Sequence, residues 1–213
     1  MKNHEILVLS LLLALSPLSN SFGYTGKCDP CDPKESRHYG IKPGDLLELR
    51  AKNLELLKAS SAGDLEQLKE LLDEGAEVNV MNNEGMTPLH WAALEGKANV
   101  IEELFHAGAD INARDKDGLT PLHWASSRGK TETVSLLLDL GAELNTTDKY
   151  GETALHLAAS FLQEDVIRIL INRNIYIYKL SKDGYTAYHY AQRPRVLGSK
   201  EKRERILELL EYR

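Results

Sequence analysis

Four histidines recur at a fixed interval of 33 residues, and histidine is well suited to hold a metal ion or move a proton at neutral pH. They are His90, His123, His156 and His189. A ladder of metal ligands is one interpretation, but a whole repeat separates successive imidazoles, so no two of them could share an ion. The favoured interpretation is structural, because buried polar side chains normally have partners inside the protein. No metal site is therefore predicted.

Two cysteines form a second motif that could do chemistry, Cys28 and Cys31 in the order C-x-x-C. In an exported protein they could close a small disulfide, which is the favoured interpretation. A redox pair of the thioredoxin type would need to begin a helix that follows a strand, and the flanking sequence predicts neither element. A zinc site that included His38 would have three visible ligands, one fewer than a closed structural site needs.

Composition and the remaining motifs exclude several classes of protein. The chain contains no serine nucleophile elbow, phosphate-binding loop, H-E-x-x-H helix or dinucleotide fingerprint, so no catalytic residue, enzyme activity or cofactor is predicted. Among 213 residues, 26 are basic and 32 are acidic, and this net charge of −6 argues against a general nucleic-acid binder. The longest apolar run has about ten residues, half the length of a spanning helix, so no stable membrane insertion of the mature chain is expected.

The first residues have the layout of a secretory signal peptide, residues 1–23. Lys2 precedes an apolar stretch over residues 6–15, and the small residues Ser21 and Gly23 stand at −3 and −1 of a cleavage site before Tyr24. An N-terminal helix buried in the fold is the alternative. The signal peptide predicts export, to a periplasm or outside the cell. Residues 24–44, which hold the two cysteines, are predicted to be a flexible tether.

Longer motifs around the histidines keep the same interval and decide the fold. The first motif reads TPLHWA from Thr87 and Thr120, TALHLA from Thr153 and TAYHYA from Thr186. The second reads GAEVN, GADIN and GAELN at residues 75–79, 108–112 and 141–145. These motifs resemble the ankyrin repeat, over residues 45 to 213, and the layout is similar to small exported ankyrin proteins of bacteria. The resemblance implies an all-α solenoid of helix-turn-helix units with β-hairpin loops.

The residues also make physical sense as helical units. Each Thr-Pro pair can begin a helix, because proline at the first turn lacks only an N–H that would be unpaired there. Val100, Ile101, Leu104 and Phe105 form an apolar stripe at helical spacing, and Gly108 can end that helix in the left-handed conformation. One such unit cannot bury its apolar face alone, so neighbouring units must stack to form the core.

About five repeats are predicted, and the outer two are modified as caps. The boundaries are residues 45–81, 82–114, 115–147, 148–180 and 181–213. The first helix is predicted to open at Asp45, with Glu48 completing a capping pair. The last repeat has about six extra residues near residues 195–200, followed by a final helix over residues 201–210. A monomer is expected.

Polar and aromatic residues inside the repeats are predicted to stabilise the fold. The resemblance implies that each histidine bonds backbone groups of an adjoining hairpin. Asparagines of the second motif fit side chains that brace the hairpins, and the tryptophans of the first motif are expected to fill core instead of stacking on a ligand. These residues are Asn79, Asn112 and Asn145, and Trp91 and Trp124.

The resemblance further implies that a protein partner binds a concave groove, lined by hairpin tips and the exposed side of the first helices. Alignment of the repeats gives the tips as Asn83, Glu84, Met86, Lys116, Asp117, Leu119, Lys149, Tyr150, Glu152, Lys182, Asp183 and Tyr185. The groove candidates chosen from the tips and helices are Met86, Leu94, Lys116, Leu119, Arg128, Tyr150, Phe161 and Tyr185. The leading hypothesis is a non-enzymatic, exported protein-binding module. A secreted effector acting on a host protein is the alternative, followed by a redox or metal module using the two cysteines.

The C-terminal third departs most from the pattern. Residues 24–181 carry 17 basic and 26 acidic groups, whereas residues 182–213 carry 8 and 5. Tyrosines beside arginines are typical of binding hot spots. In the favoured interpretation Tyr176, Tyr178, Tyr188 and Tyr190 pack the last two repeats, and a binding surface is the alternative.

Overall fold

The computed structural model describes residues 43–196 and 198–211. The predicted signal peptide and the C-x-x-C motif at Cys28 and Cys31 lie outside these residues. The described residues form ten helices and no β-strand. In chain order the helices are α2 (Pro43–Ala62), α3 (Leu65–Asp73), α4 (Pro88–Glu95), α5 (Ala98–His106), α6 (Pro121–Ser127), α7 (Thr131–Asp139), α8 (Ala154–Ser160), α9 (Glu164–Asn172), α10 (Ala187–Gln192) and α11 (Lys200–Glu211).

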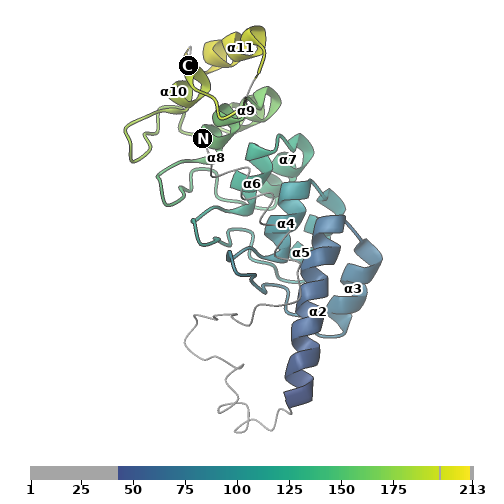
Figure 1. Ribbon diagram of the computed structural model, residues 1–213. Coiled ribbons are helices and arrows are strands. Elements are labelled where there is room, and N and C mark those ends of the chain that lie inside the picture. Colours follow the sequence, from purple (N-terminus) through teal and green to yellow (C-terminus); the bar gives the residue numbers. More distant parts are fainter. Residues whose placement is uncertain (1–42, 197, 212–213) are drawn as a thin grey trace.

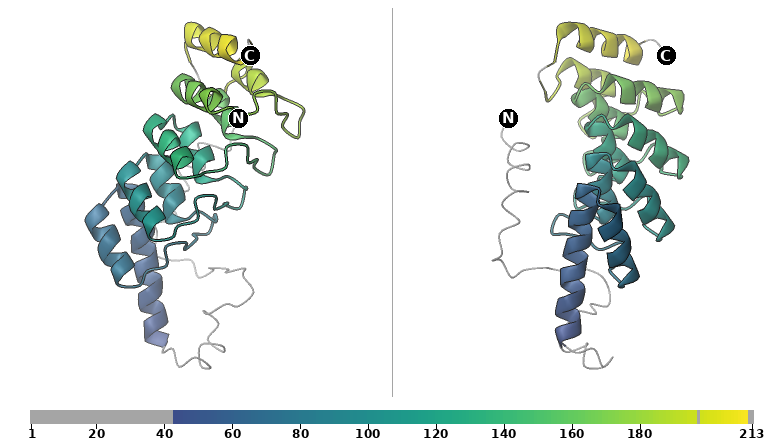
Figure 2. Two further views of the ribbon diagram at one scale, coloured as in Figure 1. Left: turned by 180° about the vertical axis from the view of Figure 1, so that it is seen from behind. Right: turned by 90° about the vertical axis from the view of Figure 1, so that its right-hand side faces the viewer.

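The helices stack in two layers, as the resemblance implied (Figure 1). Helices α2, α4, α6, α8 and α10 contact one another in order as an inner layer, and α3, α5, α7, α9 and α11 do the same as an outer layer. The loops between successive pairs leave the stack on one side (Figure 2). The prediction of an all-helical solenoid is confirmed. None of the described helices is long and apolar enough to cross a membrane.

Local sequence explains where the helices begin and end. Helix α4 begins at Pro88, and the Thr87 side chain accepts the backbone N–H of His90 as its cap. Gly108 follows α5 with a φ of +89°, the left-handed conformation predicted for it.

The predicted apolar stripe of α5 is confirmed except at one end. Val100, Ile101 and Leu104 are fully buried, but Phe105 is 36% exposed. The prediction that Phe105 belongs to the buried apolar stripe was therefore wrong. Helix α5 buries three of the four apolar side chains that its sequence suggested.

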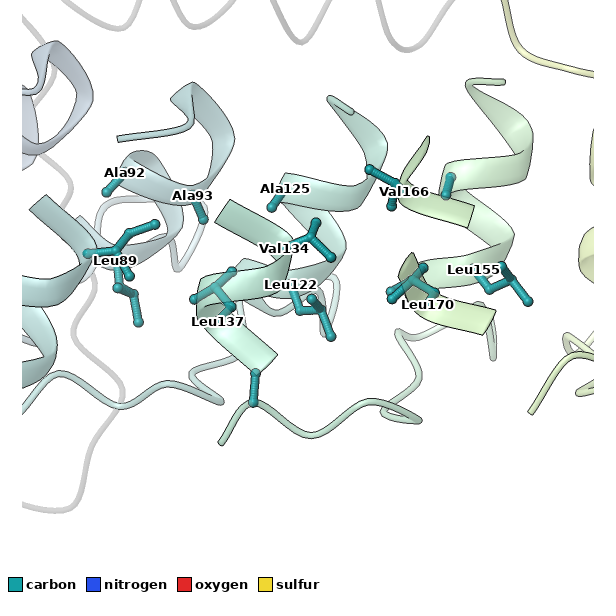
Figure 3. Close-up of a cluster of buried hydrophobic side chains, with 14 of the residues drawn as sticks. Leu89, Ala92, Ala93, Leu122, Ala125, Val134, Leu137, Leu155, Val166 and Leu170 are labelled. Carbon is teal, nitrogen blue, oxygen red and sulfur yellow. The ribbon is translucent and has the colours of Figure 1, made fainter. Parts of the chain in front are cut away.

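The core is a continuous column of equivalent side chains (Figure 3). Leu89, Leu122 and Leu155 occupy one position of the inner helices, and all three are at most 1% exposed. Small residues beside them let the inner helices approach: Ala92, Ala125 and Ala158, all fully buried. Because each leucine is covered by the next repeat, removing one repeat would expose its neighbour's core.

Backbone hydrogen bonds join the loop tips of successive repeats. The N–H of Lys116 donates to Glu84 O (2.9 Å), and the two following tips repeat this bond. These are Lys149 N–H to Asp117 O and Lys182 N–H to Tyr150 O, both 2.8 Å. Within a tip, Asp115 N–H donates to Leu119 O (3.0 Å), so the implied β-hairpins are present as closed turns without paired strands.

The asparagines brace the bases of these loops, which confirms their predicted role. Oδ1 of Asn79 accepts the N–H of Asp110 (2.9 Å), and Nδ2 donates to Gly108 O (3.1 Å). Asn112 and Asn145 accept from the following loops in the same way, from the N–H groups of Glu143 and Tyr176.

Both ends differ from the middle repeats. Helix α2 begins at Pro43, two residues before Asp45, so the predicted helix start at Asp45 was wrong. It continues for 20 residues, to Ala62. At the other end, residues 193–199 separate α10 from α11, and α11 extends one residue beyond each end of the predicted final helix.

Candidate functional site

Both ring nitrogens of the buried histidines have backbone partners. Nδ1 of His90 accepts the N–H of Thr87 (3.1 Å), so the proton of the neutral ring lies on Nε2. Nε2 then donates to Leu119 O of the next repeat at 3.1 Å. The same pair of bonds holds the other two, His123 to Glu152 O (3.3 Å) and His156 to Tyr185 O (3.2 Å).

These bonds confirm the structural interpretation of His90, His123 and His156. His189 of the last unit is exposed and its Nδ1 accepts the N–H of Thr186 in the same unit at 3.3 Å, so the implied bond to an adjoining hairpin is confirmed for the three buried rings only. Burial lowers the pKa of His90 and His123 to about 4, and it lowers the pKa of His156 as well. The three rings are therefore neutral at pH 7, and each one ties a helix start to the loop of the next repeat. Within residues 43–196 and 198–211 no cluster of metal-ligating side chains is present.

The loop tips and the inner-helix residues beside them form a surface that we call the tip face. It consists of residues 83–86, 116–119, 149–152 and 182–185, together with residues 94–95, 127–128 and 160–161. Four of the eight predicted contact residues are exposed there, Lys116, Arg128, Tyr150 and Tyr185. Leu119 and Phe161 are half-buried. The tyrosines are the largest exposed side chains of the tips, at 52% and 47%.

Two of the predicted contact residues are buried, and their selection has to be corrected. Met86 is 3% exposed and Leu94 is 5% exposed, so neither offers its side chain to a partner. At the position of Leu94, the equivalent Ser127 and Ser160 are buried too. This inner-helix position therefore faces neighbouring protein, which the alignment of repeats could not show.

Glu152 of the tip face has a buried carboxylate in an ion pair with the exposed Arg195, and this pair was not predicted. The Glu152 carboxylate is 5% exposed and accepts two hydrogen bonds from Nη2 of Arg195, at 3.0 and 3.3 Å. It also accepts the hydroxyl of Tyr190 at 2.7 Å. The prediction that Glu152 is an exposed tip residue was wrong. The sequence did contain a signal for this pair. Glu152 places a carboxylate at the position where two other repeats have the apolar residues Met86 and Leu119.

Tyr190 links this ion pair to the histidine column. Its ring stands edge-on to His156, with 5.2 Å between centroids. Burial, with the neighbouring Glu152 carboxylate also contributing, raises the pKa of Tyr190 to about 12. The phenol is therefore a hydrogen-bond donor at neutral pH.

Arg195 belongs to the extra residues of the last repeat, which fold back on α8. Its backbone N–H donates to Ser160 O at the end of α8 (2.8 Å), while its side chain reaches Glu152 before the start of α8. A side chain at Gly198 would meet Leu162, so this segment packs closely on the turn after α8. The extra residues thus cover one side of the fourth unit.

The C-terminal tyrosines divide between core and surface. Tyr188 and Tyr190 pack against the hydrophobic core, as favoured for them. Tyr176 and Tyr178 are 65% and 61% exposed, so the prediction that they pack the last two repeats was wrong. Tyr178 stands where earlier repeats have a bracing asparagine.

The tryptophans lie at the edge of the core. Trp91 and Trp124 are both half-buried, in agreement with a packing role. Nε1 of Trp124 donates to Oδ2 of Asp115 at 3.0 Å, which satisfies its polar group within the same repeat.

Comparison with known proteins identifies the repeat. A family model described as ankyrin repeats (3 copies) matches residues 56–148 and 145–201. The chain is also similar to Protein VAPYRIN-LIKE of Medicago truncatula, 50% identical over 42 residues, which are 20% of this chain and 9% of that protein. A putative palmitoyltransferase, ZDHHC13, of Danio rerio is 34% identical over 71 residues, 33% of this chain and 10% of that protein. The chain thus spans about a tenth of the length of either relative.

Proposed function

This chain is a member of the ankyrin-repeat family, and on that premise we propose that it is a non-enzymatic module that binds a protein partner through its tip face. Ankyrin repeats are protein-interaction modules, and the tip face is where this chain offers a partner both a fixed backbone and exposed aromatic side chains.

One observation carries the proposal: the backbone bonds that join tip to tip from Glu84 to Lys182. They hold the tips in register, so that Tyr150 and Tyr185 project from neighbouring, mutually fixed turns. A pre-ordered surface loses little conformational entropy on binding, and tyrosine adds contact area with few rotatable bonds.

Site-specific photo-crosslinking tests the proposal. A photoreactive phenylalanine analogue at Tyr185 or Arg128 is expected to crosslink the partner in extracts of the source organism. The matched control carries the analogue at Phe105, which is 36% exposed on the outer helix α5. A partner that crosslinks equally from Phe105, or from Phe105 alone, would place binding on the outer layer and refute the proposal.

We also propose that the chain is exported, because residues 1–23 have the layout of a signal peptide. N-terminal sequencing of the chain produced in its own cells is expected to begin at Tyr24. Replacing Gly23 by tryptophan puts a bulky residue at −1 and is expected to block cleavage, with Asn20→Trp as the control. Recovery of an uncleaved chain inside the cell would contradict export.

A further inference from the structure

We propose that the C-terminal half of the tip face, together with Arg193 and Arg195 of the segment after α10, binds an extended, acidic segment of the partner. The proposal rests on the proposed function and adds the chemistry of the partner. Four observations support this proposal. They are the uneven distribution of charge along the chain, the different pairing of two equivalent lysines, an arginine held in place by a buried carboxylate, and two exposed tyrosines.

The charge of the chain is distributed unevenly. Residues 24–181 carry 17 basic and 26 acidic groups, whereas residues 182–213 carry 8 basic and 5 acidic groups. The basic excess therefore lies at the end of the stack that includes the last tip and the segment after α10. An acidic partner would be attracted to this end and repelled by the rest of the molecule.

Two equivalent lysines differ in their pairing. Nζ of Lys149 lies 2.6 Å from Oδ1 of Asp117 in the preceding tip, and its charge is balanced there. One repeat later the position of Asp117 is occupied by Tyr150, so Lys182 has no acid at the corresponding place. Lys182 is exposed and makes no ion pair among the described residues. It is available to a carboxylate of the partner.

Arg195 is held in place by a carboxylate that uses only part of its guanidinium. Both hydrogen bonds to Glu152 are donated by Nη2, so Nε and Nη1 are not used by that carboxylate. The Arg195 side chain remains 36% exposed, whereas Glu152 is buried. Glu152 is thus a positioning residue, and the remaining donors of Arg195 suit a second carboxylate. Arg193, two residues earlier, is also exposed.

Tyr150 and Tyr185 supply apolar contact in the tip that holds Lys182 and in the tip before it. They project from successive tips, joined by the bond from Lys182 N–H to Tyr150 O. Stacked repeats lie roughly 10 Å apart, which is about three residues of extended chain. A segment in extended conformation can therefore run from tip to tip and place its carboxylates at Lys182 and Arg195.

Fluorescence anisotropy tests the inference with three labelled probes. They are a peptide of alternating glutamate and valine, the same peptide with lysine in place of glutamate, and a single-stranded oligothymidine. The acidic peptide is expected to bind most tightly. The double variant Lys182→Glu and Arg193→Glu is expected to weaken binding of the acidic peptide about tenfold or more, since two attractive charges become repulsive. The matched control reverses Lys58 and Lys69 at the other end of the stack and should leave binding unchanged.

Tyrosine variants separate a tip-face contact from simple charge attraction. Tyr150→Ala is expected to weaken binding of the acidic peptide about fivefold or more. Tyr176→Ala, which removes a tyrosine that is more exposed (65% against 52%) but lies at the base of a loop, should have no effect. Circular dichroism of every variant confirms that the stack remains folded.

Three outcomes would overturn the inference. They are equal binding of the acidic and basic peptides, oligothymidine binding as tight as that of the acidic peptide, and insensitivity to the reversal of Lys182 and Arg193. If Tyr185 still crosslinks a partner in any of these cases, the proposed function stands and only the acidic chemistry is wrong. Failure of the crosslinking itself would remove the proposed function.

Discussion

Acidification from pH 7 to about 4.5 is expected to lower the free energy of unfolding by about 5 kcal/mol through His90 and His123. Burial lowers the pKa of each ring to about 4, against about 6.5 in the unfolded chain. Below pH 6.5 the unfolded chain therefore binds protons that the folded chain does not. Stability is fully present above pH 6.5 and is lost progressively as the pH falls toward 4.

Other titratable groups change the size of this loss of stability, but the contribution of His90 and His123 keeps its sign. The lowered pKa of buried His156 adds to it. Burial raises the pKa of Asp115 and Asp148, so protonation of these carboxyls on acidification favours the folded state and offsets part of the loss. Urea unfolding followed by circular dichroism at both pH values measures the net change.

Glutamine at the two histidines provides the control. Its side chain can accept and donate like the neutral ring but does not titrate in this range. The double variant His90→Gln and His123→Gln is expected to be less stable at pH 7 yet to lose much less stability on acidification. If its loss equals that of the parent chain, the histidines do not cause the pH dependence.

Removal of the Arg195 side chain is expected to destabilise the chain by about 3 kcal/mol. Arg195→Ala leaves the Glu152 carboxylate buried, with the hydroxyl of Tyr190 as its remaining side-chain donor. An uncompensated buried charge is costly, whereas an exposed pair contributes less than about 1 kcal/mol. The exposed pair of Arg173 and Asp139, at 2.7 Å, provides the matched control in Arg173→Ala.

A second substitution tests the cause. Glu152→Gln removes the buried charge, so Arg195→Ala should cost much less in that background. Equal costs in both backgrounds would show that Arg195 acts by packing of its aliphatic stem or by its backbone bond to Ser160. Urea unfolding of the four chains gives the coupling free energy.

Much of the fold follows from short-range sequence signals. The 33-residue interval, the Thr-Pro helix starts and the glycines after α3, α5 and α7 act within one repeat, and the structure agrees with all three. The histidine and asparagine bonds also span about one repeat and recur with it, so a pattern in the sequence could predict them. Exposure of Tyr150 agrees with its place at a turn tip, whereas Tyr185 is exposed at a position where Met86 and Glu152 are buried.

The sequence by itself determined the repeat, its helices and the bonds that recur from unit to unit, because each depends on residues at a constant separation. Only the tertiary structure decided which equivalent positions are exposed, since the burial of Met86 and Leu94 depends on the side chains around each unit. It also decided that Arg195 meets Glu152, 43 residues away, through an insertion that occurs once. A contact made once has no period, so its partner is found only when the chain is folded.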